Sequence, residues 1–132
     1  MRLNKYRGIR SYDKQWIYGS LLIDKDGDFH ILEPNIIEKD GHHIQIDSDS
    51  PMFFDNETIG QFTGKYDKNK AEIYEHDKIL IAKEDEEEIF VIQWDNDTAR
   101  FVLIGSTYVV DFNNYLGLDC EVIGNLHKSE DN

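Results

Sequence analysis

Three groups of polar residues could in principle carry chemistry, and the first is an alternating run of carboxylates. Asp24, Asp26 and Asp28 could offer oxygen ligands to calcium. An EF-hand loop that starts at Asp24 needs glycine at its sixth position and glutamate at its twelfth. Those positions hold Phe29 and Asn35. We therefore interpret the run as a polar hairpin turn and expect no metal site.

The histidines form the second group, and their spacing does not match a metal site. His42 and His43 are adjacent, so on a strand their side chains point to opposite faces and cannot chelate one ion together. A structural zinc site usually includes cysteines, and Cys120 is the only one in this sequence, which also leaves no partner for an intrachain disulfide. We interpret the five histidines as ordinary surface or partly buried side chains. They are His30, His42, His43, His76 and His127.

The third group, Glu75, His76 and Asp77, contains residue types that act as acids and bases. Three consecutive residues of a strand or turn cannot all converge on one point. The segment 60–64, Gly-Gln-Phe-Thr-Gly, is not a nucleophile motif, and it lacks the Gly-Lys-Ser/Thr ending of a phosphate loop. The sequence thus predicts no catalytic, metal-binding or cofactor-binding residues, and we do not expect an enzyme.

Aromatic and basic side chains interleave near the N-terminus, which is a pattern typical of binding. Such a set can stack on and clamp single-stranded nucleic acid. It suits a subunit interface equally well, because aromatic residues and arginine are enriched at interface hot spots. In a third interpretation, the aromatics belong to a core and the bases to its rim. The residues that would form a self-association surface are Tyr6, Arg7, Arg10, Tyr12, Trp16 and Tyr18.

Charge is distributed unevenly along the 132 residues, whose formal net charge is −13. The first 14 residues carry five bases and one acid, a net charge of +4, whereas the other 118 carry 26 acids and nine bases, a net charge of −17. An acidic body repels phosphates, so direct binding to duplex nucleic acid or to an anionic membrane is disfavoured. The basic N-terminal segment could dock on another copy or on its own body, and the acidic body could bind a basic partner. Solubility alone would also explain the charge.

The hydrophobic pattern indicates a folded protein of the cytosol. Hydrophobic residues make up 39% of the chain, which is enough to form a core. No apolar run approaches the ~18 residues of a membrane span. The first residues lack the apolar stretch of a secretory signal. We expect no association with a membrane.

Short apolar runs separated by turn residues predict a mainly β fold. Strands of this length, about ten residues apart, favour a small barrel or a sandwich. We expect an N-terminal β-hairpin region, 1–56, and a C-terminal barrel-like region, 57–132, that together form one compact unit. The expected strands are 15–23, 29–33, 42–46, 58–63, 78–83, 89–94, 99–104, 107–110 and 121–126, with one helical turn at 111–116.

The turn Asp95-Asn96-Asp97 lies between two apolar strands and predicts a hairpin. Alternation along the first of these strands puts Ile92 and Trp94 on one face. We therefore expect Trp94 and Phe101 to be core residues of this hairpin.

Four blocks of the sequence resemble the YopX family, a group of small proteins found mainly in bacteriophages and prophages. The chain departs from the usual family pattern at two turns, where Asn69-Lys70 replaces Asn-Gly and Glu75-His76-Asp77 replaces Glu-Gly-Asp. The blocks are Tyr6-Arg7 with Tyr12-Asp13 and Trp16-Ile17-Tyr18-Gly19; Gly60-Gln61-Phe62-Thr63-Gly64 with Asp67, Ile73-Tyr74-Glu75 and Asp77; Val91-Ile92-Gln93-Trp94 with Phe101; and Glu121-Val122-Ile123-Gly124-Asn125.

The resemblance implies an SH3-type β-barrel for the C-terminal half, a phage or prophage origin, and residence in the cytoplasm of the bacterial host. It implies no activity for any residue. Two functional hypotheses follow. The first is a non-enzymatic interaction module that self-associates into a homo-oligomer. The alternative is an acidic phage protein that binds a basic host or phage nucleic-acid-binding protein, with its acidic body in place of phosphates.

Overall fold

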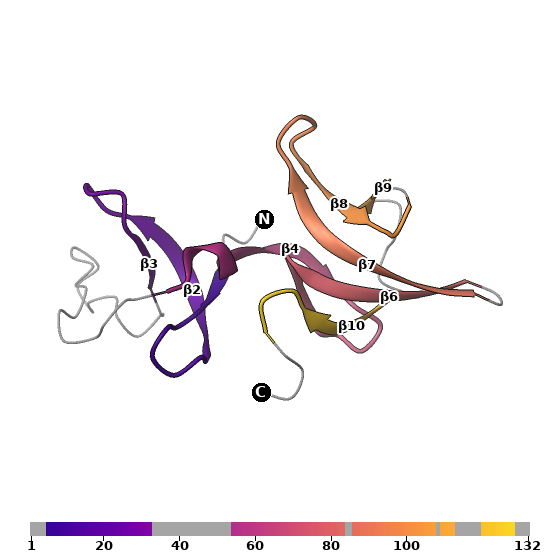
Figure 1. Ribbon diagram of the computed structural model, residues 1–132, viewed down its shortest axis with the longest axis horizontal. Coiled ribbons are helices and arrows are strands. Elements are labelled where there is room, and N and C mark those ends of the chain that lie inside the picture. Colours follow the sequence, from indigo (N-terminus) through magenta and orange to yellow (C-terminus); the bar gives the residue numbers. More distant parts are fainter. Residues whose placement is uncertain (1–4, 33–53, 84–85, 108, 113–119, 129–132) are drawn as a thin grey trace. The chain divides into compact units, whose positions relative to one another are not determined.

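The computed structural model describes residues 5–32, 54–83, 86–107, 109–112 and 120–128. Within these ranges the chain forms antiparallel strands joined by tight turns and no α-helix, which confirms the mainly β class. A 3₁₀ turn, η2 (Asn56–Thr58), precedes the fourth strand. The strands are β1 (Tyr6–Ile9), β2 (Trp16–Ile23), β3 (Phe29–Leu32), β4 (Gly60–Tyr66), β5 (Glu72–Tyr74), β6 (Asp77–Lys83), β7 (Glu86–Asp95), β8 (Arg100–Ile104), β9 (Val109–Asp111) and β10 (Cys120–Asn125) (Figure 1).

The chain divides into two compact units. The described residues up to Gln61 form the first unit, and those from Phe62 onward form the second. Strand β4 begins in the first unit and continues into the second. The predicted division into 1–56 and 57–132 within one compact unit stays a prediction. No helix among the described residues is long and apolar enough to cross a membrane.

In the first unit, β1 is a central strand. It pairs with β2 on one side and with the start of β4 on the other, in the sheet order β3-β2-β1-β4-β5. Residues 6–9 are therefore an integral strand of the sheet, and close packing holds this strand in place. Ile9 is buried, and a Cβ on Gly8 would lie only 3.0 Å from Ile59 and 3.1 Å from Ile31. Side chains of the first unit thus pack closely against β1.

The predicted hairpin around residues 24–28 is confirmed as β2 and β3, which pair from Ser20–Leu32 to Ile23–Phe29. Its turn is built by one side chain. The Asp24 Oδ1 accepts hydrogen bonds from the backbone N–H groups of Asp26 and Asp28, both at 2.9 Å. An aspartate that caps its own turn in this way is a common device of turn geometry.

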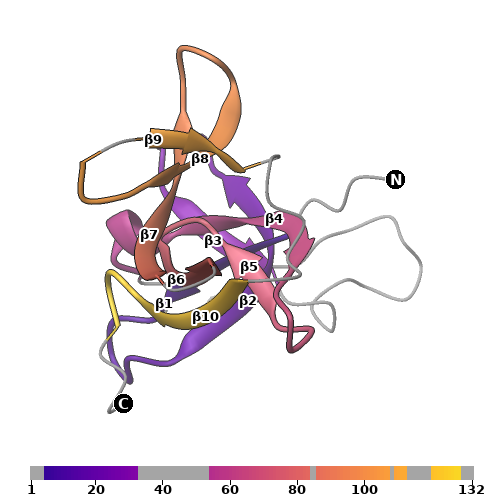
Figure 2. The ribbon, with the colours of Figure 1, turned by 90° about the vertical axis from the view of Figure 1, so that its right-hand side faces the viewer.

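The second unit contains the meander β6-β7-β8-β9, with β10 added beside β6, so that the sheet order is β10-β6-β7-β8-β9 (Figure 2). Period-2 alternation puts one side of each strand into a common core. The core residues are Ile73, Ile79, Ile81, Phe90, Ile92, Leu103, Phe112 and Cys120. No pairing among the described strands closes a sheet into a barrel, so the SH3-type barrel stays a prediction.

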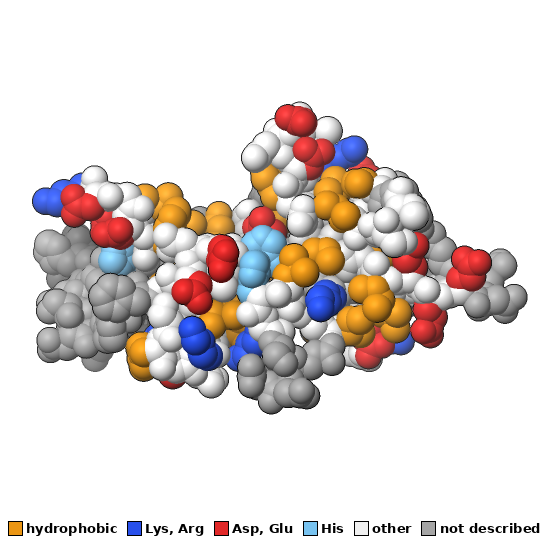
Figure 3. All heavy atoms as spheres, in the orientation of Figure 1, with side chains coloured by type: hydrophobic (Ala, Val, Ile, Leu, Met, Phe, Trp, Pro, Cys, Tyr) orange, Lys and Arg blue, Asp and Glu red, His pale blue; other side chains and the backbone are white. Residues whose placement is uncertain are grey.

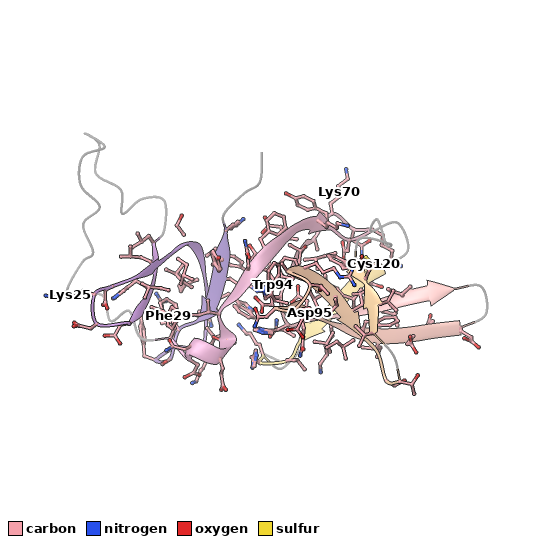
Figure 4. All side chains as sticks on the ribbon, turned by 90° about the horizontal axis from the view of Figure 1, so that it is seen from above. Lys25, Phe29, Lys70, Trp94, Asp95 and Cys120 are labelled. Carbon is pink, nitrogen blue, oxygen red and sulfur yellow. The ribbon has the colours of Figure 1, made fainter. Side chains whose placement is uncertain are left out.

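The β7–β8 hairpin has the predicted register but not the predicted burial. Trp94 pairs with Phe101, and their rings meet edge to face at 5.1 Å. Phe101 packs against the core, whereas Trp94 is 37% exposed. The expectation that Trp94 is a core residue is therefore wrong. The Trp94–Phe101 pair lies next to the turn, and the last pair with both side chains fully buried is Ile92–Leu103. Figure 4 shows Trp94 beside Asp95 at the end of this strand.

Other predicted elements differ in extent. Strand β4 continues to Tyr66 instead of ending at residue 63, and β5 follows it, although the sequence analysis expected no strand there. The last strand of the meander is β9, which lies two residues later than the predicted strand 107–110 at its start. The predicted strand 42–46 lies outside the described residues, as do 113–116 of the predicted helical turn.

Candidate interaction face on strands β1 and β2

Strands β1 and β2 carry four of the six predicted self-association residues, and Arg10 and Tyr12 lie in the connection between the two strands. Arg7 lies opposite Tyr18, and Ile9 lies opposite Trp16, so these four side chains share one face of the sheet. Tyr6 lies opposite Gly19 and belongs to the other face. The structure therefore splits the predicted set, and the face with Arg7, Trp16 and Tyr18 is the larger part.

Three cations of the first unit lie over aromatic rings. The Arg7 Cζ is 4.0 Å from the centroid of Trp16, the Arg10 Cζ is 4.6 Å from that of Tyr12, and the Lys5 Nζ is 5.8 Å from that of Tyr18. A cation over an aromatic face contributes about 0.5–1 kcal/mol at exposed sites and about 2 kcal/mol when water is excluded. The interleaved sequence thus forms three cation–aromatic pairs, two with the strand residues Trp16 and Tyr18 and one in the turn that follows β1.

The two tyrosines of these pairs are exposed to solvent. Tyr12 is 62% exposed and Tyr18 is 41% exposed, whereas Trp16 is half-buried. Flat rings that are already held by a neighbouring cation lose little conformational entropy when a partner covers them. This arrangement has the chemistry of a binding surface, and we call these three pairs the cation–aromatic face.

The Asp13 carboxylate holds Arg10, one cation of the cation–aromatic face, in place. The Arg10 guanidinium donates to both oxygens of Asp13, at 3.0 and 2.5 Å. This side-chain hydrogen bond from Arg10, helped by the backbone N–H of Gln15, holds the pKa of Asp13 below its ordinary value. Lys14 lies 3.8 Å from Asp55. Part of the basic charge near the N-terminus is therefore balanced within the first unit itself.

The first aspartate of the run, Asp24, uses its carboxylate to hold the β2–β3 turn. In addition to its two backbone hydrogen bonds, Asp24 lies 2.8 Å from the Nε2 of His30. This contact with His30 is the main cause that lowers the pKa of Asp24. Across the part of the chain that the structure describes, no three His, Cys, Asp or Glu side chains gather as metal ligands. His42 and His43 lie outside that part.

Glu75 and His76 form the turn between β5 and β6, Asp77 begins β6, and the three residues take separate roles. Asp77 points into the protein, whereas His76 lies 3.6 Å from Glu75 and meets the ring of His127 edge to face at 4.8 Å. The backbone of His76 connects two neighbours, because its N–H donates to Ile92 and its carbonyl accepts from Leu126.

Two buried carboxylates, which were not among the predicted functional residues, hold strand β10 in place. Asp67 is 6% exposed, and its carboxylate accepts from the backbone N–H groups of Asn69, Ala71 and Val122 at 2.8–2.9 Å. Asp77 is 1% exposed and accepts from the Tyr74 N–H at 2.8 Å and from the Asn125 amide at 3.0 Å. Both aspartates belong to the second block of the family resemblance, which was the available signal in the sequence.

In a comparison with protein families, the family model described as YopX protein matches residues 5–131. The chain belongs to the YopX family. The matched range includes the cation–aromatic face, both buried aspartates and β10. Strand pairing and hydrogen bonds join residues from different blocks of the resemblance, such as Tyr6 with Gln61 and Asp67 with Val122. A comparison with curated proteins finds no match. Membership of the YopX family suggests a phage-associated protein.

Proposed function

We propose that this YopX-family protein is a non-enzymatic interaction module that self-associates through its cation–aromatic face. The observation that supports the proposal is the set of three cation–aromatic pairs with two exposed tyrosines. Aromatic and arginine side chains supply most of the affinity at interface hot spots. Charges at the rim set orientation and association rate more than affinity.

The test is the mass of the protein in solution as a function of concentration. We expect sedimentation analysis to show a homo-oligomer that dissociates on dilution, and the double variant Tyr12→Ser/Tyr18→Ser to remain monomeric. Tyr66→Ser is the matched control, because Tyr66 is also an exposed tyrosine, at 47% exposure, but lies in the second unit. A parent protein that stays monomeric at high micromolar concentration in low salt would contradict the proposal.

Salt provides a second readout of the same proposal. A surface charge pair contributes only about 0–1 kcal/mol. Raising the salt concentration should therefore weaken the oligomer without abolishing it, because the rings supply most of the contact. Complete dissociation at moderate salt would show that charge alone drives the association.

An alternative function is the capture of a basic nucleic-acid-binding protein of the host or the phage. The observation that favours it is the acidic stretch 84–88, of which Glu86 and Glu87 are exposed at the start of β7. Immobilised protein should then retain a basic partner in a salt-sensitive manner, and Glu86→Lys/Glu87→Lys should release it. Retention that does not change in this variant would rule out the acidic stretch as the binding element.

A further inference from the structure

The β6–β7 ribbon extends beyond the strands that flank it in the sheet of the second unit. Strand β7 begins at Glu86, but its pairing with β8 begins only at Val91. On the other side, β6 continues to Lys83, but among the described strands it pairs with β10 only as far as Ile81. Figures 1 and 4 show this end of the ribbon projecting from the rest of its sheet. Within the described part of the chain, the end of the ribbon therefore has two strands and no third.

The side of β7 that faces away from β6 is an open strand edge over Glu86–Ile89. Gly105, which follows β8, marks its end, because a Cβ at this position would lie only 2.9 Å from the ring of Phe90. Along a strand, alternate residues direct their backbone N–H and C=O groups toward one neighbour and then the other. Half of these groups in the open edge thus point away from β6. Such an edge can pair with another extended chain.

Charge determines which chain can pair with the open edge. Residues 82–88 carry five acids and one base, Lys83, a net charge of −4, and Figure 3 shows acidic side chains at this end of the second unit. Glu86 and Glu87 are exposed. Because successive side chains alternate, these two carboxylates lie on opposite sides of the ribbon, and Glu87 shares its side with Ile89, which is 52% exposed. Two acidic edges of this kind repel each other, so a basic chain is favoured.

We propose that the open edge Glu86–Ile89 of β7 binds an extended basic segment of a partner protein as an added strand. The inference rests on the alternative function, the capture of a basic protein, and adds how the partner binds. Backbone hydrogen bonds to β7 supply the affinity. Side chains of an added strand lie about 4.5–5.5 Å from those opposite them and alternate between the two sides. Consecutive Lys or Arg residues therefore meet Glu86 on one side and Glu87 on the other, and an aliphatic residue beyond them meets Ile89.

Backbone methylation of a model peptide tests strand addition at constant charge. The probe is the fluorescently labelled peptide Lys-Arg-Lys-Arg-Val-Thr-Val, titrated with the full-length protein at low salt, together with two forms that are N-methylated at the odd or at the even amides. Only one of the two sets of N–H groups can face β7. We expect one methylated form to bind at least about tenfold more weakly, since it loses several hydrogen bonds, and the other to bind like the unmodified peptide. Equal affinities of the two methylated forms, or no binding of the unmodified peptide, would overturn the proposal.

Charge variants of the protein locate the site. Glu86→Gln/Glu87→Gln should weaken binding of the unmodified peptide about fivefold to thirtyfold, because each surface charge pair contributes up to about 1 kcal/mol. Glu57→Gln/Asp97→Asn is the matched control, since it removes two charges from exposed acids outside the ribbon end and should leave the affinity unchanged. Equal weakening by the control would overturn the open edge as the site. Binding that depends on Glu86 and Glu87 but ignores methylation would overturn strand addition and leave the alternative function standing, whereas binding that ignores both carboxylates would overturn both.

Discussion

At the scale of single residues, the most consequential side chains of the second unit are two buried aspartates. Asp67 accepts a hydrogen bond from the backbone N–H of Val122, and Asp77 accepts one from the side-chain amide of Asn125, both in β10. Removing a buried acceptor leaves its donors without partners and costs their desolvation free energy as well as the hydrogen bonds. The role of these carboxylates is therefore to hold β10 on the sheet.

We expect Asp77→Ala to lower the free energy of unfolding by about 2–4 kcal/mol, because it leaves the buried Tyr74 N–H and the Asn125 amide without this acceptor. Thermal and denaturant unfolding would measure the loss. Asp97→Ala is the control, since Asp97 is an exposed aspartate in the turn between β7 and β8. Equal stability of the two variants would contradict the assigned role of Asp77.

Two residues stand in the left-handed region of backbone conformation at the turns where this chain departs from the usual family pattern. Lys70 has φ of 68° and His76 has φ of 76°. Glycine adopts such angles without the steric cost that a Cβ imposes. The two departures from the family's usual glycine are therefore places of local backbone strain.

Replacing Lys70 with glycine should raise the free energy of unfolding by about 0.5–1 kcal/mol, because it removes the Cβ cost at an exposed turn. Lys70 points away from the strands in Figure 4, so little packing is lost. His76→Gly is the informative comparison, since it also removes the contact with His127 and should yield no gain. Denaturant midpoints of the two variants would decide the matter, and destabilisation by Lys70→Gly would contradict the strain argument.

At the scale of elements, the position of β1 in the middle of its sheet changes the meaning of the N-terminal segment. A strand bonded on both sides supplies backbone hydrogen bonds to two neighbours. Its Ile9 N–H also donates to Thr58 at 2.9 Å, which ties the strand to η2. The cation–aromatic face is thus displayed by a structural strand and not by a detachable arm.

Deleting residues 1–14 should unfold the first unit instead of releasing a soluble monomer with both units intact. We expect the deletion to lose part of its β signal in circular dichroism and to become sensitive to limited proteolysis between residues 15 and 59. The charge-reducing variant Lys5→Gln, which keeps the strand, is the control and should retain the parent's spectrum. A deletion variant that is as resistant to protease as the parent would contradict the central position of β1.

In the β7–β8 hairpin, the contribution of Trp94 to the free energy of unfolding depends on how much of its side chain is buried. A fully buried tryptophan replaced by alanine costs about 3–5 kcal/mol. Trp94 is 37% exposed and mainly contacts Phe101, so we expect Trp94→Ala to cost about 1–2 kcal/mol. Chemical unfolding of the variant measures this value, and a loss above 3 kcal/mol would place Trp94 in the core after all.

At the scale of the whole molecule, three turn aspartates link stability to pH. Hydrogen bonds from Arg10, His30 and Thr98 are the largest causes that lower the pKa of Asp13, Asp24 and Asp95, respectively. A carboxyl group with a lowered pKa in the folded state stabilises the fold above its ordinary pKa of 3.8. This stabilisation disappears as the pH falls through the lower, folded-state pKa.

We therefore expect the melting temperature to fall when the pH is lowered from 5 through 3.8 and below. The triple variant Asp13→Asn/Asp24→Asn/Asp95→Asn should show a smaller fall, because three linked groups no longer titrate. Melting curves at a series of pH values would test this difference. Identical pH profiles for the parent and the variant would show that other carboxyl groups control acid unfolding.

The sequence by itself determined the mainly β class, the β2–β3 and β7–β8 hairpins and the YopX resemblance, because alternation and turn chemistry act between near neighbours. Only the tertiary structure decided which strands pair across the chain, since Tyr6 and Gln61 or Asp67 and Val122 meet over separations that no local pattern encodes. The same limit explains Trp94, whose alternation indicated a face but whose burial depends on where the core ends. It also explains the cation–aromatic face, because the sequence showed the residue types and only the β1–β2 register set each cation over its ring.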